Sequence, residues 1–202
     1  MKNKITPGRG RPRLFDEMDV LRRAQIAFLQ GGFEATAYED IASATGLSKP
    51  SLYNTFGDKT ALFERVVAGY AEHAKREIML SFASAPNLAE AGKSMLLAAV
   101  DVYAAPDKPS TGCLLVGTAL PSCTHNEEVR KTLSTFIGTL EDDLQQLITS
   151  HFSADAKKSG KTPRVLALLV TSLLFSLAVR ARAGVTRRRL RTIASELAAI
   201  LA

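Results

Sequence analysis

The stretch from Gly32 to Val66, GFEATAYEDIASATGLSKPSLYNTFGDKTALFERV, decides how this chain folds. It contains two short segments with helical spacing of apolar residues, 38–45 and 49–56, separated by a turn at Gly46. Glycine commonly ends a helix because it adopts the left-handed conformation at no steric cost. Two short helices joined by a tight glycine turn are typical of a helix-turn-helix.

Capping residues mark where the helices of this stretch begin. Thr36 and Glu39 predict a capping box at the start of the first short helix. Ser48 and Asp58 are the predicted N-caps of the second short helix and of the longer helix that follows. Pro50 fits the second helix because proline is tolerated in the first turn.

The second short helix has a polar outer side that packing does not require. Its members are Lys49, Ser51, Tyr53, Asn54 and Thr55. A plain helical corner gains nothing from these side chains, whereas phosphates and base edges would bind them. The pattern therefore favours a helix that reads DNA.

Outside this stretch the sequence predicts helices almost throughout and no strand. Asp16 caps a first helix, and later helices lie between Pro86 and Pro106, before Pro121, along the apolar stripe from Val129 to Ile148, and over 164–183 and 187–202, with a polar loop over 153–163. We expect an all-α protein of about nine helices. A three-helix N-terminal helix-turn-helix DNA-binding domain would precede a larger helical C-terminal domain.

Charge is unevenly distributed over the three predicted parts, which are a flexible basic arm (1–14), a helix-turn-helix domain (15–60) and a larger helical domain (61–202). Residues 1–60 carry nine Lys/Arg and seven Asp/Glu, residues 61–156 carry seven and twelve, and residues 157–202 carry ten and one. A basic arm on an acidic middle is common in nucleic-acid binders with a separate regulatory body. A solvated tail would have the same composition.

Length and composition exclude several classes of protein. The 202 residues are 46% hydrophobic and 23% charged, values typical of one or two globular domains. Two cysteines are too few for a disulfide scaffold and indicate a reducing compartment. The opening MKNKITPGRGRPR has no apolar core, and the apolar run 165–179 is shorter than the roughly 20 residues of a membrane span. We expect a soluble, cytoplasmic protein with no membrane partner.

The stretch quoted above, with the residues from Val20 that precede it, resembles the N-terminal signature of TetR-family transcriptional regulators of the AcrR-like kind. The rest of the chain has only a compatible helical pattern. The resemblance implies three N-terminal helices that bind DNA and a helical domain for dimerisation and effector binding. Family members are mostly repressors released by a small molecule. The implied partners are a double-stranded DNA operator, a second copy of the chain and an unidentified small-molecule effector.

The same resemblance implies roles for individual residues. Tyr53 and Lys59 match backbone-phosphate contacts, and Thr36 and Tyr38 lie where the second helix meets phosphate. Ser48 marks a helix N-terminus, whose free N–H groups attract anions. The predicted DNA-binding residues are Arg9, Arg11, Arg13, Thr36, Tyr38, Ser48, Lys49, Pro50, Ser51, Tyr53, Asn54 and Lys59.

The arginines of that set come from the segment Gly8–Arg13, GRGRPR, which resembles an AT-hook core. An extended Arg-Gly-Arg-Pro segment fits the narrow A·T minor groove, whose negative potential attracts guanidinium groups. The arm directly precedes the first helix, so minor-groove binding is the favoured interpretation over a solvated tail.

Cys113 and Cys123 form a possible redox sensor. The segment from Thr111 to Leu114, with Cys123 ten residues after Cys113, resembles TetR-family repressors of the NemR type, which sense oxidants or electrophiles. We expect Cys113 in the first turn of a helix, where the helix dipole favours the thiolate. The alternative is that both are small buried apolar residues, a frequent environment for free cysteine.

The family resemblance implies that the last two helices form a four-helix dimer bundle, and their apolar stripes fit such an interface. The residues expected there are Leu169, Leu173, Leu177, Ile193 and Leu197. The arginines between Arg180 and Arg191 are interpreted as a solvated face beside this interface.

Two rival classes, an enzyme and a helical scaffold, fit the sequence less well. The chain has no GxSxG, P-loop, HExxH or paired CxxC motif, and Cys123-x-His125 lacks further ligands at zinc spacing. We therefore predict no catalytic residue, no metal and no cofactor. A scaffold would need neither the basic arm nor the polar helix face.

Overall fold

The computed structural model describes residues 15–104 and 112–201, and within these ranges every regular element is helical. The helices are α1 (Glu17–Ala35), α2 (Tyr38–Thr45), α3 (Lys49–Phe56), α4 (Lys59–Ala83), α5 (Leu88–Tyr103), the π-helical turn η1 (Leu115–Ala119), α6 (Leu120–Ser122), α7 (Glu127–His151), α8 (Ser153–Lys158), α9 (Pro163–Arg182), α10 (Arg187–Ala198) and the 3-10 turn η2 (Ala199–Leu201). The prediction of an all-α chain with an N-terminal helix-turn-helix is confirmed.

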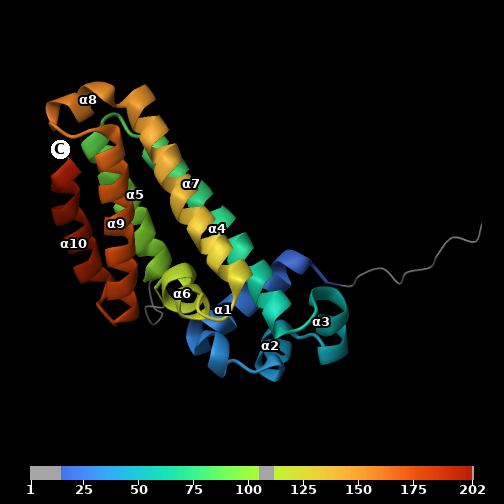
Figure 1. The fold of residues 1–202 in the computed structure, drawn as a ribbon. Helices are drawn as coiled ribbons and strands as arrows, with labels where there is room; N and C mark the ends of the chain where they lie inside the picture. Colours follow the sequence, from blue (N-terminus) through green and yellow to red (C-terminus); the bar gives the residue numbers. More distant parts are fainter. Residues whose placement is uncertain (1–14, 105–111, 202) are drawn as a thin grey trace, which may run out of the picture.

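The helices form a small N-terminal group joined to a larger bundle (Figure 1). α1, α2 and α3 lie together at one end, and α4 runs from them into the bundle. α5 packs against α4, α9 and α10, and α7 packs against α4 and α9. α8 lies at the end of the bundle farthest from α2 and α3.

The N-caps mostly follow the sequence prediction. The side chains of Asp16, Ser48 and Asp58 accept hydrogen bonds from N–H groups in the first turns of α1, α3 and α4. The capping box assigned to Thr36 and Glu39 is wrong. α2 covers the predicted residues, but its N-cap is Ala37, whose N–H donates to Oδ2 of Asp40 at 2.9 Å.

An aromatic cluster holds α1 against α4. The Phe28 and Phe63 ring centroids are 4.9 Å apart, and those of Phe33 and Phe63 are 4.6 Å apart. α1 is interrupted at Gly32, whose φ of 77° lies outside the helical region. The interruption brings Phe33 to the same cluster as Phe28 and directs the chain into α2.

The segment 153–163, predicted to be a loop, contains the short helix α8. Oδ2 of Asp155 accepts a hydrogen bond from Leu88 N–H at 3.0 Å, and Ala156 is buried. These tertiary contacts, which link residues 67 positions apart, stabilise a helix that its polar sequence does not indicate.

α9 is long and apolar enough to cross a membrane by length and composition alone. Its buried side packs against α5 and α7, as in a core helix of a soluble protein.

Candidate nucleic-acid interface

α2 and α3 meet at the turn that the sequence predicts. Gly46 has φ 74° and ψ 11°, the left-handed conformation, and its N–H donates to Ala42 O at 3.0 Å. Ile41 and Leu52 are fully buried on the inner sides of the two helices. Apolar packing therefore fixes α3 to the rest of the N-terminal group and leaves its other side to solvent.

The outer side of α3 is exposed as the sequence predicts. Lys49, Pro50, Tyr53 and Asn54 are exposed, and Ser51 is half-buried. The Tyr53 side chain retains 62% of its accessible surface, which is unusual for an aromatic residue that could pack inward. This side of α3 thus offers an ammonium group, an amide and a phenol to a partner.

Lys49 forms an ion pair with Glu39 of α2. The hydrogen bond from Lys49 lowers the pKa of the Glu39 carboxyl, which is therefore ionised at neutral pH. Both side chains are more than half exposed, where water screens such a pair strongly. A phosphate or a guanine edge can therefore compete for the lysine at small cost.

Tyr38 and Thr36 are occupied by contacts inside the protein. The Tyr38 hydroxyl donates to Gly57 O at 2.7 Å, and partial burial raises its pKa. Thr36 is buried, and its Oγ1 donates to Gly32 O at 2.6 Å. The Thr36 hydroxyl therefore closes the turn after α1, and the phosphate contact at this position stays a prediction.

Lys59 also faces inward in this structure. Its Nζ donates to Phe33 O at 3.0 Å and to Thr36 O at 3.2 Å, and it lies 4.5 Å from the Phe33 ring centroid. A cation near the carbonyl oxygens at the end of a helix is stabilising. In this state Lys59 anchors the α1–α2 connection.

Arg65 of α4 is a positioning residue that sequence reasoning missed. Its guanidinium donates to Thr55 O at 3.3 Å and to Glu17 Oε2 at 3.0 Å, and lies 4.8 Å from the Phe56 ring centroid. It thereby ties the end of α3 to the start of α1. No motif indicates this role, because Glu17 is 48 residues away in sequence.

The predicted minor-groove contacts Arg9, Arg11 and Arg13 lie outside the described residues. Within the part of the chain that the structure describes, no group of three or more His, Cys, Asp or Glu side chains is placed to hold a metal ion.

The two cysteines differ from the expected reactive pair. Cys113 is buried just before the helix that begins at Leu114, and the Tyr70 hydroxyl donates to its Sγ at 3.4 Å. Burial raises the pKa of both Cys113 and Cys123. The N–H groups of Leu115 and Val116 favour the Cys113 thiolate, as expected at a helix start, but burial outweighs them and the net pKa is raised.

The predicted dimer interface requires one correction. Leu177 is fully buried inside the protomer, so it does not reach the surface of α9. The other predicted interface residues, Leu169, Leu173, Ile193 and Leu197, are half-buried. The exposed large apolar side chains here are instead Val165, Leu168 and Val179 of α9 and Ile200 of η2.

Comparison with known proteins agrees with this geometry. Residues 20–66 match the model of the family described as bacterial regulatory proteins, tetR family. The chain is 28% identical over 192 residues to the HTH-type transcriptional repressor ComR of Escherichia coli (strain K12), covering 94% of this chain and 90% of ComR.

Solved structures extend the similarity over the whole chain. A cysteine mutant of the TetR-family regulator CifR, complexed with 26-base-pair operator DNA, superposes with a TM-score of 0.82 at 27% identity, covering 96% of this chain and 100% of CifR. The reduced form of Escherichia coli NemR has a TM-score of 0.71 at 14% identity, covering 92% and 97%, which shows a shared fold.

α3 belongs to a helix-turn-helix and keeps a polar side exposed. This site, together with these relatives, defines a DNA-binding transcriptional regulator. The relatives are regulators and not enzymes. Residues 20–66 match the DNA-binding region of the tetR family of bacterial regulatory proteins, and the whole chain has the fold of solved TetR-family regulators.

Proposed function

We propose that this chain is a cytoplasmic homodimeric repressor that binds a roughly palindromic operator and is released from it by a small molecule. The observation that carries the proposal is the exposed polar side of α3, held by the buried Ile41 and Leu52. One short helix reads few base pairs, so selective binding needs two copies about one helical turn of DNA apart. The repressor name of ComR and the operator DNA bound to CifR support this proposal.

Within the operator, Lys49 and Asn54 would read base edges. Lysine binds guanine O6 and N7, and asparagine binds adenine N6 and N7. Ser48, Pro50, Ser51 and Tyr53 would approach the backbone near the start and outer side of α3. Lys59 would add a phosphate contact only by leaving its carbonyl partners.

We assign a function to each of three parts of the chain. Residues 1–14 would be a basic arm in the minor groove and residues 15–60 the DNA-binding domain. Residues 61–202 would form the effector-binding and dimerisation domain. α9 and α10 would form the interface between copies. Val165, Leu168 and Val179 lie on one side of α9 and are all exposed, although they are large and apolar. Burial in a dimer would remove this apolar surface from water.

The proposed effector site lies between α4 and α5. A hollow of about 70 Å³ is lined by Tyr70, His73, Ile78, Val102 and Tyr103 among others. It is much smaller than the roughly 300–1,000 Å³ of ordinary ligand sites, so a ligand would have to separate α4 from α5. An apolar molecule with one polar group able to bind His73 fits these walls.

Two hydrogen bonds to α1 would transmit a movement of the bundle to the DNA-binding helices. Thr118 Oγ1 of η1 donates to Phe28 O at 3.3 Å, and Arg182 of α9 donates to Leu29 O at 2.5 Å. Both acceptors lie on α1 just before its interruption at Gly32. A ligand that shifts the bundle would therefore reorient α1 and, with it, α3.

The test is to select bound fragments from the source genome and titrate the recovered site with labelled protein. We expect tight, salt-sensitive and sequence-selective binding, with a palindromic consensus. Equal affinity for the recovered site and for scrambled DNA of the same length would contradict the proposal.

A further inference from the structure

The DNA-reading end of this protein is itself acidic. Residues 15–60, which include α1 to α3, carry four Lys/Arg and seven Asp/Glu. DNA is a dense polyanion, and release of its counterions by Lys and Arg supplies most of the non-specific attraction. The helix-turn-helix is therefore repelled by the phosphates around its own site, and positive charge elsewhere must offset this repulsion.

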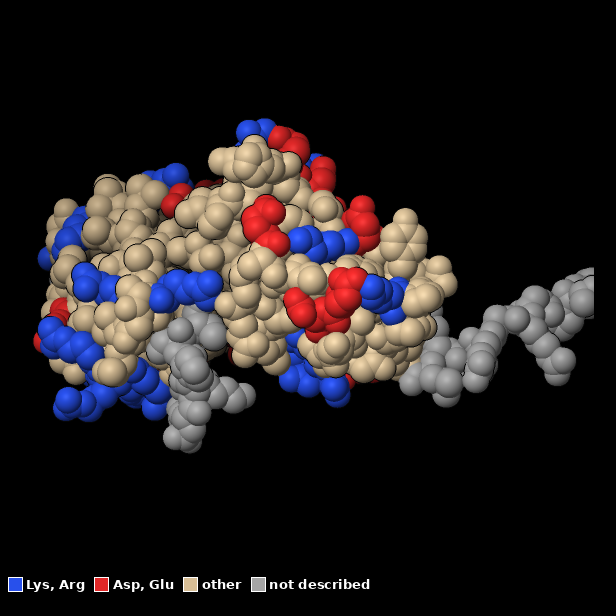
Figure 2. Space-filling model, turned by 90° about the horizontal axis from the view of Figure 1, so that it is seen from below, with Lys and Arg blue, Asp and Glu red and all other residues tan. Residues whose placement is uncertain are grey.

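A second concentration of charge lies where α9 turns into α10. We call it the α9–α10 arginine cluster, and its members are Arg180, Arg182, Arg187, Arg188, Arg189 and Arg191. No acidic residue interrupts the sequence from Arg180 to Ser195. The view from below shows blue side chains gathered over the end of the molecule formed by α9 and α10 (Figure 2).

Part of the cluster is accounted for by contacts within the protomer. Arg187 and Arg191 both bind Oδ1 of Asp101, at 2.7 and 2.8 Å. Arg182 binds Leu29 O. Arg188 and Arg189 are exposed, and their side chains have no hydrogen-bond or ion-pair partner among the described residues.

Arg188 and Arg189 also occupy positions that disfavour positive charge. They are the second and third residues of α10, in the first turn after its N-cap Thr186. The partial positive charge at a helix N-terminus destabilises cations there and stabilises anions. Two unpaired arginines in this turn reduce stability, and a bound anion would remove the repulsion.

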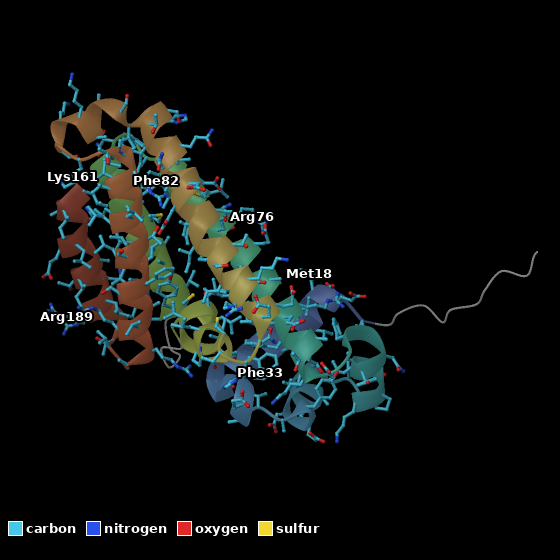
Figure 3. All side chains as sticks on the ribbon, viewed as in Figure 1. Met18, Phe33, Arg76, Phe82, Lys161 and Arg189 are labelled. Atoms are coloured by element: carbon cyan, nitrogen blue, oxygen red, sulfur yellow. The ribbon has the colours of Figure 1, made fainter. Side chains whose placement is uncertain are left out.

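The cluster faces the same way as the DNA-reading end. In Figure 1 the α9–α10 turn is at the lower end of the bundle, the end at which α2 and α3 also lie. Arg189 projects from the lower end of α10 in Figure 3. Figure 2, seen from below, contains both the blue cluster and the end of the molecule with α2 and α3. The cluster, α2 and α3 thus lie at the same end of the molecule, as contact with a single DNA molecule requires.

We propose that Arg188 and Arg189 form a second DNA-binding surface that contacts the phosphates of the operator between its two half-sites. This inference rests on the proposed function, because α9 and α10 lie at the centre of the DNA only if they join the two copies. The contact is with the backbone and carries no base preference, so it increases affinity for every sequence alike.

The test compares two double variants of the full-length protein that remove the same charge. R188A/R189A removes the unpaired arginines, and K157A/K158A removes two exposed lysines of α8, at the opposite end of the bundle. Binding to the recovered operator and to scrambled DNA is measured by fluorescence anisotropy over a range of salt concentrations. Hydroxyl-radical footprinting of the operator locates the contacts.

For R188A/R189A we expect a salt slope smaller by about 0.9 for each phosphate that the variant no longer neutralises, and affinity lower on the order of tenfold for both DNAs. The footprint should weaken only between the half-sites. Its thermal midpoint should stay the same or rise, because charge that opposes the helix dipole is removed. R188K/R189K should retain the wild-type slope.

Two results would overturn the inference. One is a wild-type salt slope in R188A/R189A, and the other is an equal loss in K157A/K158A, which would assign the effect to net charge alone. Failure of the wild-type protein to prefer the operator would instead reject the proposed function, so the two failures can be told apart.

Discussion

At the scale of single residues, α3 places the side chains that would contact DNA on one side and those that pack in the core on the other. Asn54 is exposed, whereas Leu52 and Phe56 beside it are buried. The sequence predicts this division because helical spacing places these residues on opposite sides. It could not predict that Thr36 turns inward, since a threonine before a helix fits a cap and a buried turn equally well.

We predict that Asn54→Ala relaxes base preference at one position of each half-site by about 1–3 kcal/mol. The thermal midpoint should be unchanged, because the side chain is exposed. Titration against operators altered at single positions measures the effect. Gln146→Ala, which removes an exposed amide from α7, should leave the preference intact. A uniform loss over all operator variants would assign Asn54 to the backbone instead.

The cysteines lead to a second prediction at this scale. Raised pKa values leave little thiolate at pH 7, and only the thiolate reacts readily with N-ethylmaleimide. We expect slow labelling that accelerates as pH rises toward the thiol pKa, with the partly exposed Cys123 modified before the buried Cys113. Peptide mass spectrometry identifies the order.

The same samples test the redox interpretation. Rapid modification of Cys113 at pH 7, together with loss of operator binding that Cys113→Ser prevents, would support a redox-sensing repressor over one released by an apolar ligand. Unchanged operator binding after full labelling would reject the sensor.

At the scale of helices and turns, local signals predicted more than tertiary ones did. The bounds of α2 and α3 follow from Gly46, Ser48 and Gly57, whose effects act within one turn. α8 escaped prediction because it depends on Asp155 binding the distant Leu88. Leu177 was assigned to the wrong side of α9 because a helix apolar on most sides gives no indication of which side faces its own protomer.

Lys59 connects three elements, and its removal should affect stability first. Lys59→Ala removes the contacts of Nζ with the α1–α2 connection, so we expect unfolding to become easier by about 1 kcal/mol. Operator affinity should fall for all sequences while the salt slope stays constant, because the ammonium binds carbonyls and not phosphate. Lys131→Ala on α7 is the matched control. A slope smaller by about 0.9 would restore the phosphate role.

Two glycines test how tightly the segment before η1 packs on α9. Gly112 (φ 72°) and Gly160 (φ 67°) share the left-handed conformation, so alanine at either is strained by about 1–2 kcal/mol. A Cβ at Gly112 would lie 2.9 Å from Ala178 O, whereas one at Gly160 meets nothing within 4 Å. We expect Gly112→Ala to lower the denaturation midpoint more than Gly160→Ala. Equal midpoints would show that this segment moves away from α9 at little cost.

At the scale of the whole molecule, dimerisation should depend on the exposed side of α9. We predict that Leu168→Glu converts the protein to a monomer at micromolar concentration, because it places charge in the apolar contact, and that operator binding is lost with it. Sedimentation velocity measures the first effect and anisotropy the second. Leu80→Glu, at an exposed leucine of α4, is the control. A Leu168→Glu protein that stays dimeric would place the interface elsewhere.

The acidic character of residues 15–60 has a consequence for how quickly the operator is found. A protein whose basic surfaces lie apart from its base-reading helix is held near any DNA without inserting that helix. Each wrong site is then released quickly, since the carboxylates of α2 favour withdrawal of α3 from a groove where no base contact compensates. We expect this separation of charge to shorten the residence time on non-specific DNA and to lengthen the distance scanned in a given time.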